Sequence, residues 1–251
     1  MDVATPRSNP NNASAFESLF QKTLKDVAAA REKQGAFTYT PLEPDQIRLM
    51  VILPDLHGHN VDEINCILLP VHLSALPPYE CLSYCWGSME ADAGTIFCNG
   101  LPYRVSRQLL TALWCLRTAM KAPRVLWVDQ VCINQDDLEE KSSQVMRMAE
   151  IYSRAGRVLL FPGIDELHAE AIAFIFDFCR SCANTYWDKG LSAFNRAWLS
   201  RSSEDLYQLA KIPRPNDVRW VAVRALLSSS CFTRTWIRES IVCVITCRSG
   251  N

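Results

Sequence analysis

Three short apolar segments, separated by two helical patterns, most constrain what this chain can fold into. The apolar segments cover residues 80–86, 124–128 and 158–161. One helical pattern begins after Ser106, and the other begins after Asp136 or Asp137. Strands that alternate with helices are typical of parallel sheets, because a parallel connection has to cross over the sheet. The order therefore predicts an α/β fold with a mainly parallel central sheet and flanking helices.

The middle apolar segment leads into a dense group of polar residues. Asp129 follows it directly, and Asn134 and Gln135 lie in the loop before the next helix. Open α/β sheets usually present polar groups to a ligand at the carboxyl ends of their strands. The same residue types also form turns and helix caps, so a structural role stays open for all three.

Both helical patterns carry an apolar face that a sheet could cover. The first places Leu109, Leu113 and Leu116 on one face, behind Ser106 as the cap. The second has acidic residues in its first turn, where the helix dipole favours them. Its apolar stripe would consist of Val145, Met148, Ile151, Tyr152 and Ala155. We therefore expect a continuous second helix that leads into the strand at 158–161.

An amphipathic helix is predicted over residues 14–33, with Ser14 and Glu17 spaced as a capping box. Such a helix either packs on the main domain or binds a partner, and both alternatives stay open. We assign residues 1–46 to this tail and helix, and residues 47–251 to the main domain. Strands are expected over residues 47–53 and 64–69, followed by a β-hairpin around Asn99 and Gly100.

The part of the chain after the third apolar segment is harder to assign. A helical pattern covers residues 169–182, and a Trp-rich stretch follows it. We assign residues 164–230 to a helical insertion, which includes a predicted helix at 218–227. Residues 234–244 then form either a helix or a strand.

Composition sets further expectations. The net charge of −1 gives no electrostatic reason to expect a nucleic-acid partner. The chain has neither the charged-then-apolar order of a signal peptide nor the roughly 18 apolar residues of a membrane span. We therefore expect a cytoplasmic protein without a membrane span, in which the 11 cysteines act mostly as small apolar residues.

Two short motifs raise the question of a metal. Cys179 and Cys182 form a CxxC pair, and His57 and His59 share a loop. Neither motif has the additional ligands that complete a zinc site, so no metal is expected. The chain also lacks a glycine-rich phosphate loop, so no cofactor is assigned with certainty.

Three blocks of the sequence together resemble the HET (heterokaryon incompatibility) domain of filamentous fungi. Residues 79–87, read as YECLSYCWG, are similar to its opening motif, and residues 126–137, read as LWVDQVCINQDD, are similar to its central motif. Residues 231–239 are similar to its last motif, with Cys231 in place of an aromatic residue and Arg238 in place of Gln. Core motifs therefore cover residues 79–163 and 231–240.

The resemblance implies an intracellular signalling domain that acts in fungal non-self recognition and regulated cell death. It also implies association, either with a second copy or with another incompatibility protein. Many such proteins continue far beyond this domain. Whether the short C-terminus here is natural or belongs to a truncated gene prediction stays open.

HET domains are also considered remote relatives of TIR domains, some of which cleave NAD with a catalytic Glu. That relation implies a TIR-like or flavodoxin-like core, with Glu239 as the catalytic residue. A carboxylate can stabilise the oxocarbenium-like state of such a cleavage. Candidate ligand-binding residues would then be Tyr84, Trp86, Gly87, Asp129, Asn134, Gln135 and Trp236, with NAD as substrate.

Two hypotheses follow, and we favour the first. In the first, the chain is a signalling module that acts through self-association, and Glu239 pairs with a basic neighbour. In the second, it is a TIR-like NAD-cleaving hydrolase. The allelic partner, the trigger and the oligomeric state are not specified by the sequence.

Overall fold

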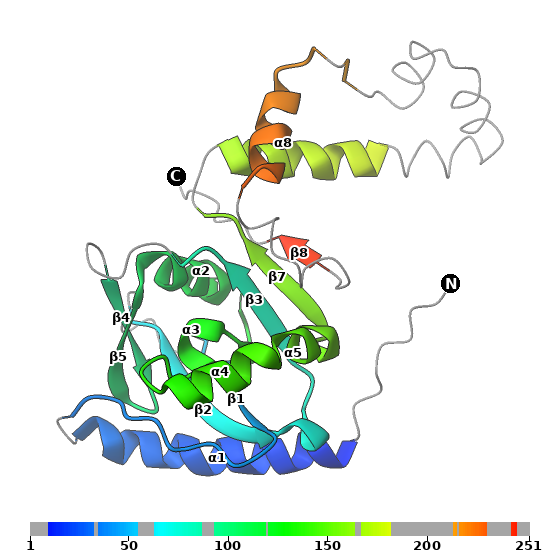
Figure 1. Ribbon diagram of the computed structural model, residues 1–251. Coiled ribbons are helices and arrows are strands. Elements are labelled where there is room, and N and C mark those ends of the chain that lie inside the picture. The colour runs from blue at the N-terminus through cyan, green and yellow to red at the C-terminus, as the bar shows by residue number, and fades with distance from the viewer. Residues whose placement is uncertain are drawn as a thin grey trace. The chain divides into compact units, whose positions relative to one another are not determined.

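An eight-stranded mixed sheet organises the larger of the two units into which this chain divides. The computed structural model describes residues 10–32, 35–54, 63–86, 93–118, 120–163, 167–181, 213–214, 216–229 and 242–244 (Figure 1). The first unit comprises Met1–Gly163 and Arg234–Thr246, and the second comprises Ile164–Thr233 and Cys247–Asn251. The predicted domain boundaries stay predictions.

The strands follow one another across the sheet in the order β5-β4-β2-β1-β6-β3-β7-β8. Their bounds are β1 Gln46–Ile52, β2 Asn65–His72, β3 Glu80–Tyr84, β4 Ala93–Cys98, β5 Leu101–Ser106, β6 Arg124–Trp127, β7 Arg157–Phe161 and β8 Val242–Val244. Four of the seven strand pairs are parallel, and three are antiparallel. The α/β prediction is confirmed, and the antiparallel pairs all lie toward the β5 edge.

The parallel part of the sheet consists of β6, β3, β7 and β8. Counted along the chain, these strands lie in the order second, first, third, fourth. In sheets of this order, the connections leave on opposite sides of the first strand, and a crevice opens at the carboxyl ends of the first and third strands. The ends of β3 and β7 are therefore the topological switch point of this sheet.

Helices cover both faces of the parallel strands. On one face, the Tyr84 hydroxyl reaches the turn of α3 (Asp129–Cys132) beside α2 (Arg107–Thr118). On the other face, the Cys81 thiol lies 3.8 Å from the Ile151 carbonyl oxygen of α5 (Met148–Arg154). Successive residues of β3 point to opposite faces, as the period of a strand requires. Buried apolar side chains fill both layers.

Glu80 links three of the four parallel strands, β6, β3 and β7, at the end where β3 begins. Its carboxylate accepts hydrogen bonds from Arg124 Nε at 2.8 Å and from the guanidinium of Arg157. Arg124 begins β6, and Arg157 begins β7. A carboxylate between two guanidinium groups fixes the register of its neighbours at a sheet end.

The predicted hairpin is confirmed, and it includes a second anchor. β4 and β5 pair antiparallel around Asn99 and Gly100, whose φ angles are 50° and 84°. These left-handed conformations suit the Asn-Gly turn that the sequence indicates. The Asn99 side chain also accepts a hydrogen bond from Leu68 N at 2.8 Å and donates one to Leu68 O. The turn is thus fastened to β2.

The N-terminal helix begins earlier than expected. α1 spans Pro10–Glu32, so Ser14 lies inside the helix and the predicted capping box is wrong as a start signal. Proline is favoured in the first turn, where its missing N–H has no partner to lose. Phe16 and Phe20 are buried, and the helix packs against β2. Of the two roles considered for the apolar face of this helix, packing on the main domain is the one that the structure shows.

The second predicted helix is broken, contrary to expectation. α4 covers Leu138–Met146, and α5 begins at Met148 after Arg147. Val145, assigned to the apolar stripe, is 49% exposed, and Met146 is 80% exposed. Just before the break, the polar side chain of Gln144 is buried and donates to Gln46 O at 3.0 Å. A contact between residues 98 positions apart thus overrides the local apolar period.

The second unit has its own aromatic cluster. Residues 167–181 are helical, and α8 spans Arg219–Leu227. The ring of Trp220 meets Phe174 edge-on at 4.9 Å between centroids and Phe178 at 5.9 Å. Such pairs stabilise helix contacts beyond their buried area. The helical predictions for 169–182 and 218–227 agree with the described parts.

Candidate functional site

The central polar segment turns sharply where β6 ends. Asp129 opens the four-residue helix α3 and is 7% exposed. Its carboxylate accepts a hydrogen bond from Gln130 N at 2.8 Å, and its carbonyl accepts one from the Gln135 side chain at 2.9 Å. Both hydrogen bonds join residues within the turn itself. Asp129 therefore has a structural role as a turn former, whatever else it binds.

Gln130 is the junction between the turn, β3 and α2. Its Oε1 accepts hydrogen bonds from the hydroxyl of Tyr84 at 3.1 Å and from Ser106 N at 3.2 Å and Oγ at 3.1 Å. Ser106 Oγ in turn accepts from Leu109 N, which confirms the predicted cap of the helix. Since all these groups are buried, each hydrogen bond replaces one that water supplied before folding. The network locks three elements together.

Two tyrosines hold the opposite side of the turn. Tyr103 Oη lies 3.1 Å from Gln130 O, and Tyr39 Oη lies 2.9 Å from Val131 O. The two hydroxyl oxygens are 2.8 Å apart, so the two phenol protons serve three contacts. Burial, followed by the neighbouring phenol, raises the pKa of Tyr39 well above its ordinary value, and burial likewise raises the pKa of Tyr103. Both phenols stay protonated and act as donors.

A buried ion pair clamps the end of the polar segment to β1. Arg48 on β1 donates to Glu140 through two nitrogens, at 2.5 and 2.9 Å. The Arg48 side chain is 3% exposed and that of Glu140 is 10% exposed. Arg48 also donates to the carbonyls of Cys132 and Thr40, and its guanidinium lies 4.7 Å from the ring centroid of Tyr39. A bidentate pair of this kind fixes geometry as well as charge.

Backbone contacts order the loop between α3 and α4. Asn134 N donates to Glu140 Oε1 at 2.7 Å, and the Asn134 side chain accepts from Asp136 N at 3.3 Å. The Asp137 side chain accepts from the main-chain N–H groups of Glu139 and Glu140, each at 3.0 Å. Asp137, the second of the two residues named as caps, therefore caps α4. The loop is held by its own side chains.

The pKa values of two thiols in this region, Cys132 and Cys81, are shifted away from those of nucleophiles. Cys132 is fully buried, and burial raises the pKa of its thiol to about 12. Burial also raises the pKa of Cys81 well above its ordinary value. A nucleophilic thiol requires the opposite shift, toward a thiolate at neutral pH. These thiols therefore pack as small apolar groups.

Three buried polar atoms near the parallel strands have no partner among the described residues. They are Ser83 Oγ, Trp127 Nε1 and Gln135 Oε1. Ser83 lies near the end of β3, Trp127 ends β6, and Gln135 follows α3. Buried polar groups without a hydrogen bond are uncommon in folded proteins. The region around the ends of the parallel strands therefore contains polar atoms whose hydrogen-bonding capacity is unused.

The structure brings together part of the predicted site. Tyr84 and Asp129 flank Gln130, and Gln135 contacts Asp129 directly. Tyr84 is fully buried, whereas Trp86 is partly exposed just beyond β3. Gly87, Trp236 and Glu239 lie outside the described residues, as do residues 234–241 of the last predicted element. The ligand-binding and catalytic roles of this set stay predictions.

The sequence did not point to the residues that hold the site in place. Arg48 and Glu140 are 92 positions apart, and Tyr39 and Val131 are likewise 92 positions apart. No local period or motif links such pairs. Gln130 lies within the central motif, but its type alone does not distinguish a junction from a turn residue.

Neither a metal centre nor a membrane-spanning helix emerges from the part of the chain that the structure describes. No three His, Cys, Asp or Glu side chains converge there as metal ligands. None of the described helices combines the length and apolar character that crossing a bilayer requires. His57, His59 and Cys182 lie outside these residues.

Comparison with known proteins identifies the family. The sequence profile described as "Heterokaryon incompatibility protein (HET)" matches residues 79–239. The chain is also 30% identical over 228 residues to "Heterokaryon incompatibility protein 6, OR allele" of Neurospora crassa, a match that covers 81% of this chain and 32% of that protein. The chain thus spans about a third of the length of this relative. No solved structure matches it. With a profile match over more than half of its residues, the chain belongs to the heterokaryon incompatibility (HET) family.

Proposed function

We propose that this chain is a signalling domain that acts in fungal non-self recognition and regulated cell death through association. The profile match over residues 79–239 carries this proposal. The Neurospora crassa relative bears an incompatibility name, which supports the same role. Self-association, or association with another incompatibility protein, is the step by which such a module would act.

The geometry of the central segment supports a module rather than a catalyst. Several of its polar groups bind one another, as Gln130 accepts three hydrogen bonds and Glu140 pairs with Arg48. The shifted thiols and phenols of this region are shifted toward their protonated forms. The loop that follows this turn is exposed at residues 136–139, and there it offers a fixed surface to a partner. We further propose a cytoplasmic location and no nucleic-acid partner.

Expression in a fungal host tests the proposal. We expect the full chain, driven by an inducible promoter, to cause growth arrest or cell death on induction. A variant that breaks the clamp, Arg48→Met, should lose the response together with its fold, as circular dichroism of the purified protein would show. Undiminished growth with abundant, folded wild-type protein contradicts the proposal.

The NAD-cleaving alternative rests on one observation, the strand order of the parallel part. Sheets of that order usually bind ligands at the carboxyl ends of the strands that here are β3 and β7, and β3 ends at Tyr84. Purified protein, concentrated or artificially clustered, should then consume NAD, and Glu239→Ala of confirmed fold should not. Absence of turnover in the clustered wild type removes the alternative.

A further inference from the structure

Two buried thiols meet where β2 and β4 lie side by side in the sheet. Cys66 and Cys98 are register partners in this parallel pair, and their sulfur atoms are 3.3 Å apart. Both are free thiols, and their exposed fractions are 1% and 0%. Register partners on neighbouring strands point to the same face of a sheet, so the backbone itself holds the two sulfur atoms together.

The backbone at this pair is compatible with a disulfide. Neighbouring strands lie about 4.8 Å apart, and Cα atoms joined by a disulfide lie about 4.4–6.8 Å apart. The two sulfur atoms would have to approach by only about 1.3 Å, because an S–S bond is about 2.0 Å long. Rotation about the two Cα–Cβ bonds can cover that distance while the strand register stays as it is.

The thiol pair lies at a narrow junction of the sheet. In the described part of the chain, β2 and β4 share two register pairs, whereas β4 and β5 share six. The β4–β5 hairpin is therefore joined more firmly within itself than to β2. A covalent link between Cys66 and Cys98 would fasten the whole hairpin to the rest of the sheet.

The hairpin in turn supports the central polar segment. Tyr103 Oη on β5 lies 3.1 Å from Gln130 O, and Ser106 at the end of β5 donates to Gln130 Oε1 through its main chain and its side chain. Gln130 is the junction between the turn, β3 and α2. A link between β2 and β4 would therefore stabilise one side of this junction through β5.

We propose that Cys66 and Cys98 form a reversible redox site, in which a peroxide oxidises the two thiols to a disulfide that fastens the β4–β5 hairpin to β2. One thiolate attacks a peroxide oxygen and becomes a sulfenic acid, and the other peroxide oxygen leaves as water. The second thiol attacks the sulfenic sulfur, the S–S bond forms, and a second water leaves. The two sulfur atoms lose two electrons, which reduce hydrogen peroxide to two waters. A dithiol reductant reverses the reaction by thiol–disulfide exchange.

Local opening of the hairpin controls access to the thiols, because both are buried in the closed sheet. The hydrogen bond with Cys66, followed by burial, raises the pKa of the Cys98 thiol well above its ordinary value. Its thiolate is therefore scarce until the strands part. Short ladders open at lower cost than the whole domain, so oxidation can proceed without global unfolding.

Peptide mapping of the full chain tests the redox site directly. Cleavage with trypsin and a glutamate-specific protease gives the peptides 64–80 and 91–104, in which Cys66 and Cys98 are the only cysteines. Native protein that is treated with hydrogen peroxide, blocked with iodoacetamide and digested without reductant should yield these two peptides joined. Dithiothreitol should separate them. Free thiols on both peptides after prolonged oxidation, or a link from either to another cysteine, overturns the inference.

Thermal unfolding shows whether the link fastens the sheet. The two cysteines are 32 positions apart, and closing a loop of this size should raise the melting temperature of the oxidised protein by about 5–10 °C. Cys98→Ala should lose this rise, and Cys66→Val serves the same purpose if that variant does not fold. Cys179→Ser, which removes an exposed thiol elsewhere, should behave like the wild type. An equal rise in Cys98→Ala, or no rise in linked wild type, contradicts the fastening.

Hydrogen exchange locates the effect within the sheet. The amide of Phe97 donates to Ile64 O at 2.8 Å, and the amide of Asn99 donates to Cys66 O at 3.0 Å. Both hydrogen bonds join the hairpin to β2. Oxidation should slow the exchange of these two amides by about tenfold or more, because the link opposes the opening that exposes them.

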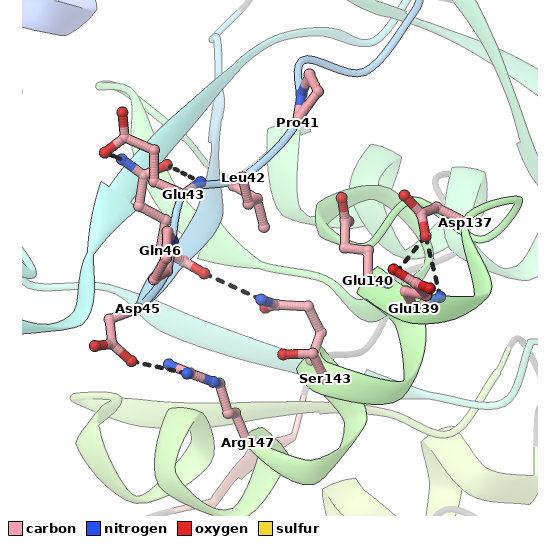
Figure 2. A pocket seen from close by; sticks show the side chains of 12 residues that line it. Pro41, Leu42, Glu43, Asp45, Gln46, Asp137, Glu139, Glu140, Ser143 and Arg147 are labelled. Carbon is pink, nitrogen blue, oxygen red and sulfur yellow. Dashed lines mark hydrogen bonds and ion pairs between the residues drawn. The ribbon is translucent and has the colours of Figure 1, made fainter.

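The pocket in Figure 2 supplies the internal reference for that measurement. It is lined by Gln46, at the end of β1 opposite to Ile52, which pairs with Cys66. Six residues of strand place it about 20 Å from the thiols. The amide of Arg147 in this pocket lies at the break between α4 and α5, so it exchanges by local opening there and should change little. Equal slowing at Arg147 and Phe97 contradicts a local link.

The redox site goes beyond the proposed function and does not rest on it. None of these measurements uses a fungal host or a partner protein. Growth arrest in the host without a linked pair of peptides removes the redox site and leaves the signalling function standing. A linked pair without growth arrest does the reverse.

Discussion

At the scale of single residues, the Arg48–Glu140 pair is the contact on which the central segment most depends. Glu140→Gln leaves the guanidinium buried without its counter-charge, which costs about 3 kcal/mol of unfolding free energy. Urea denaturation measures the change. Glu150→Gln, which breaks the exposed pair with Arg154, should change stability by less than about 1 kcal/mol. Equal losses in the two variants would contradict the buried clamp.

The network around Gln130 leads to a second expectation. Tyr84→Phe removes one donor to Gln130 Oε1 while two others remain, so the cost should be about 1 kcal/mol of unfolding free energy. Ser106→Ala removes a second donor and the helix cap, and should cost more. Thermal unfolding ranks the two variants, and a larger loss for Tyr84→Phe would show that its hydroxyl has another essential contact.

The reactivity of Cys132 follows from its raised pKa. Burial raises that pKa from 9.0 to about 12, so the folded state favours the protonated thiol. Its contribution to stability is fully present below about pH 9 and is lost as the pH rises toward 12. A short pulse of iodoacetamide at pH 8, followed by peptide mapping, should label exposed Cys179 in the native protein and Cys132 only in denaturant. Rapid labelling of native Cys132 contradicts this expectation.

At the scale of elements, two variants of the hairpin turn distinguish the cost of backbone strain from the loss of hydrogen bonds. Asn99→Gly loses the two contacts with Leu68 but fits a φ of 50°, whereas Asn99→Ala loses the contacts and keeps a Cβ there. The alanine variant should therefore be less stable than the glycine variant by about 1 kcal/mol. Chemical denaturation of the two measures the difference directly. Equal stabilities would mean that the turn relaxes to another conformation.

Elements defined by neighbouring residues were predictable, and elements defined by distant contacts were not. The Ser106 cap and the Asn99-Gly100 turn need only a few adjacent residues, and both are present. The break between α4 and α5 depends on Gln144 meeting Gln46 across the fold. The partners of the predicted site residues are equally remote, as Tyr84 and Gln130 are 46 positions apart. A one-dimensional period does not contain such information.

At the scale of the whole molecule, the edge strand β8 comes from a stretch of chain that follows residues 164–233 of the second unit in the sequence. β8 pairs in parallel with β7, although Ile164–Thr233 lies between them in the sequence. A fragment that ends at Gly163 lacks this neighbour, and it should aggregate more than the full chain because its β7 edge is unpaired. Light scattering of equal concentrations measures the effect.

The matched control for that fragment restores only the missing strand. Residues 234–246, joined to Gly163 by a short Gly/Ser linker, return β8 without the second unit. This fusion should scatter light like the full chain. If it aggregates as strongly as the fragment, the second unit rather than β8 protects the sheet.

The late arrival of β8 also has a consequence for synthesis on the ribosome. β7 ends at Phe161 and β8 begins at Val242, so residues 162–241, about 80 in number, are translated before the pair can form. At roughly 5–20 residues per second, this delay is about 4–16 s. During that interval the nascent chain presents β7 without its later neighbour, and slow or paused translation of the intervening codons prolongs the exposure. The yield of native protein should therefore respond to codon choice in this stretch and to the supply of chaperones.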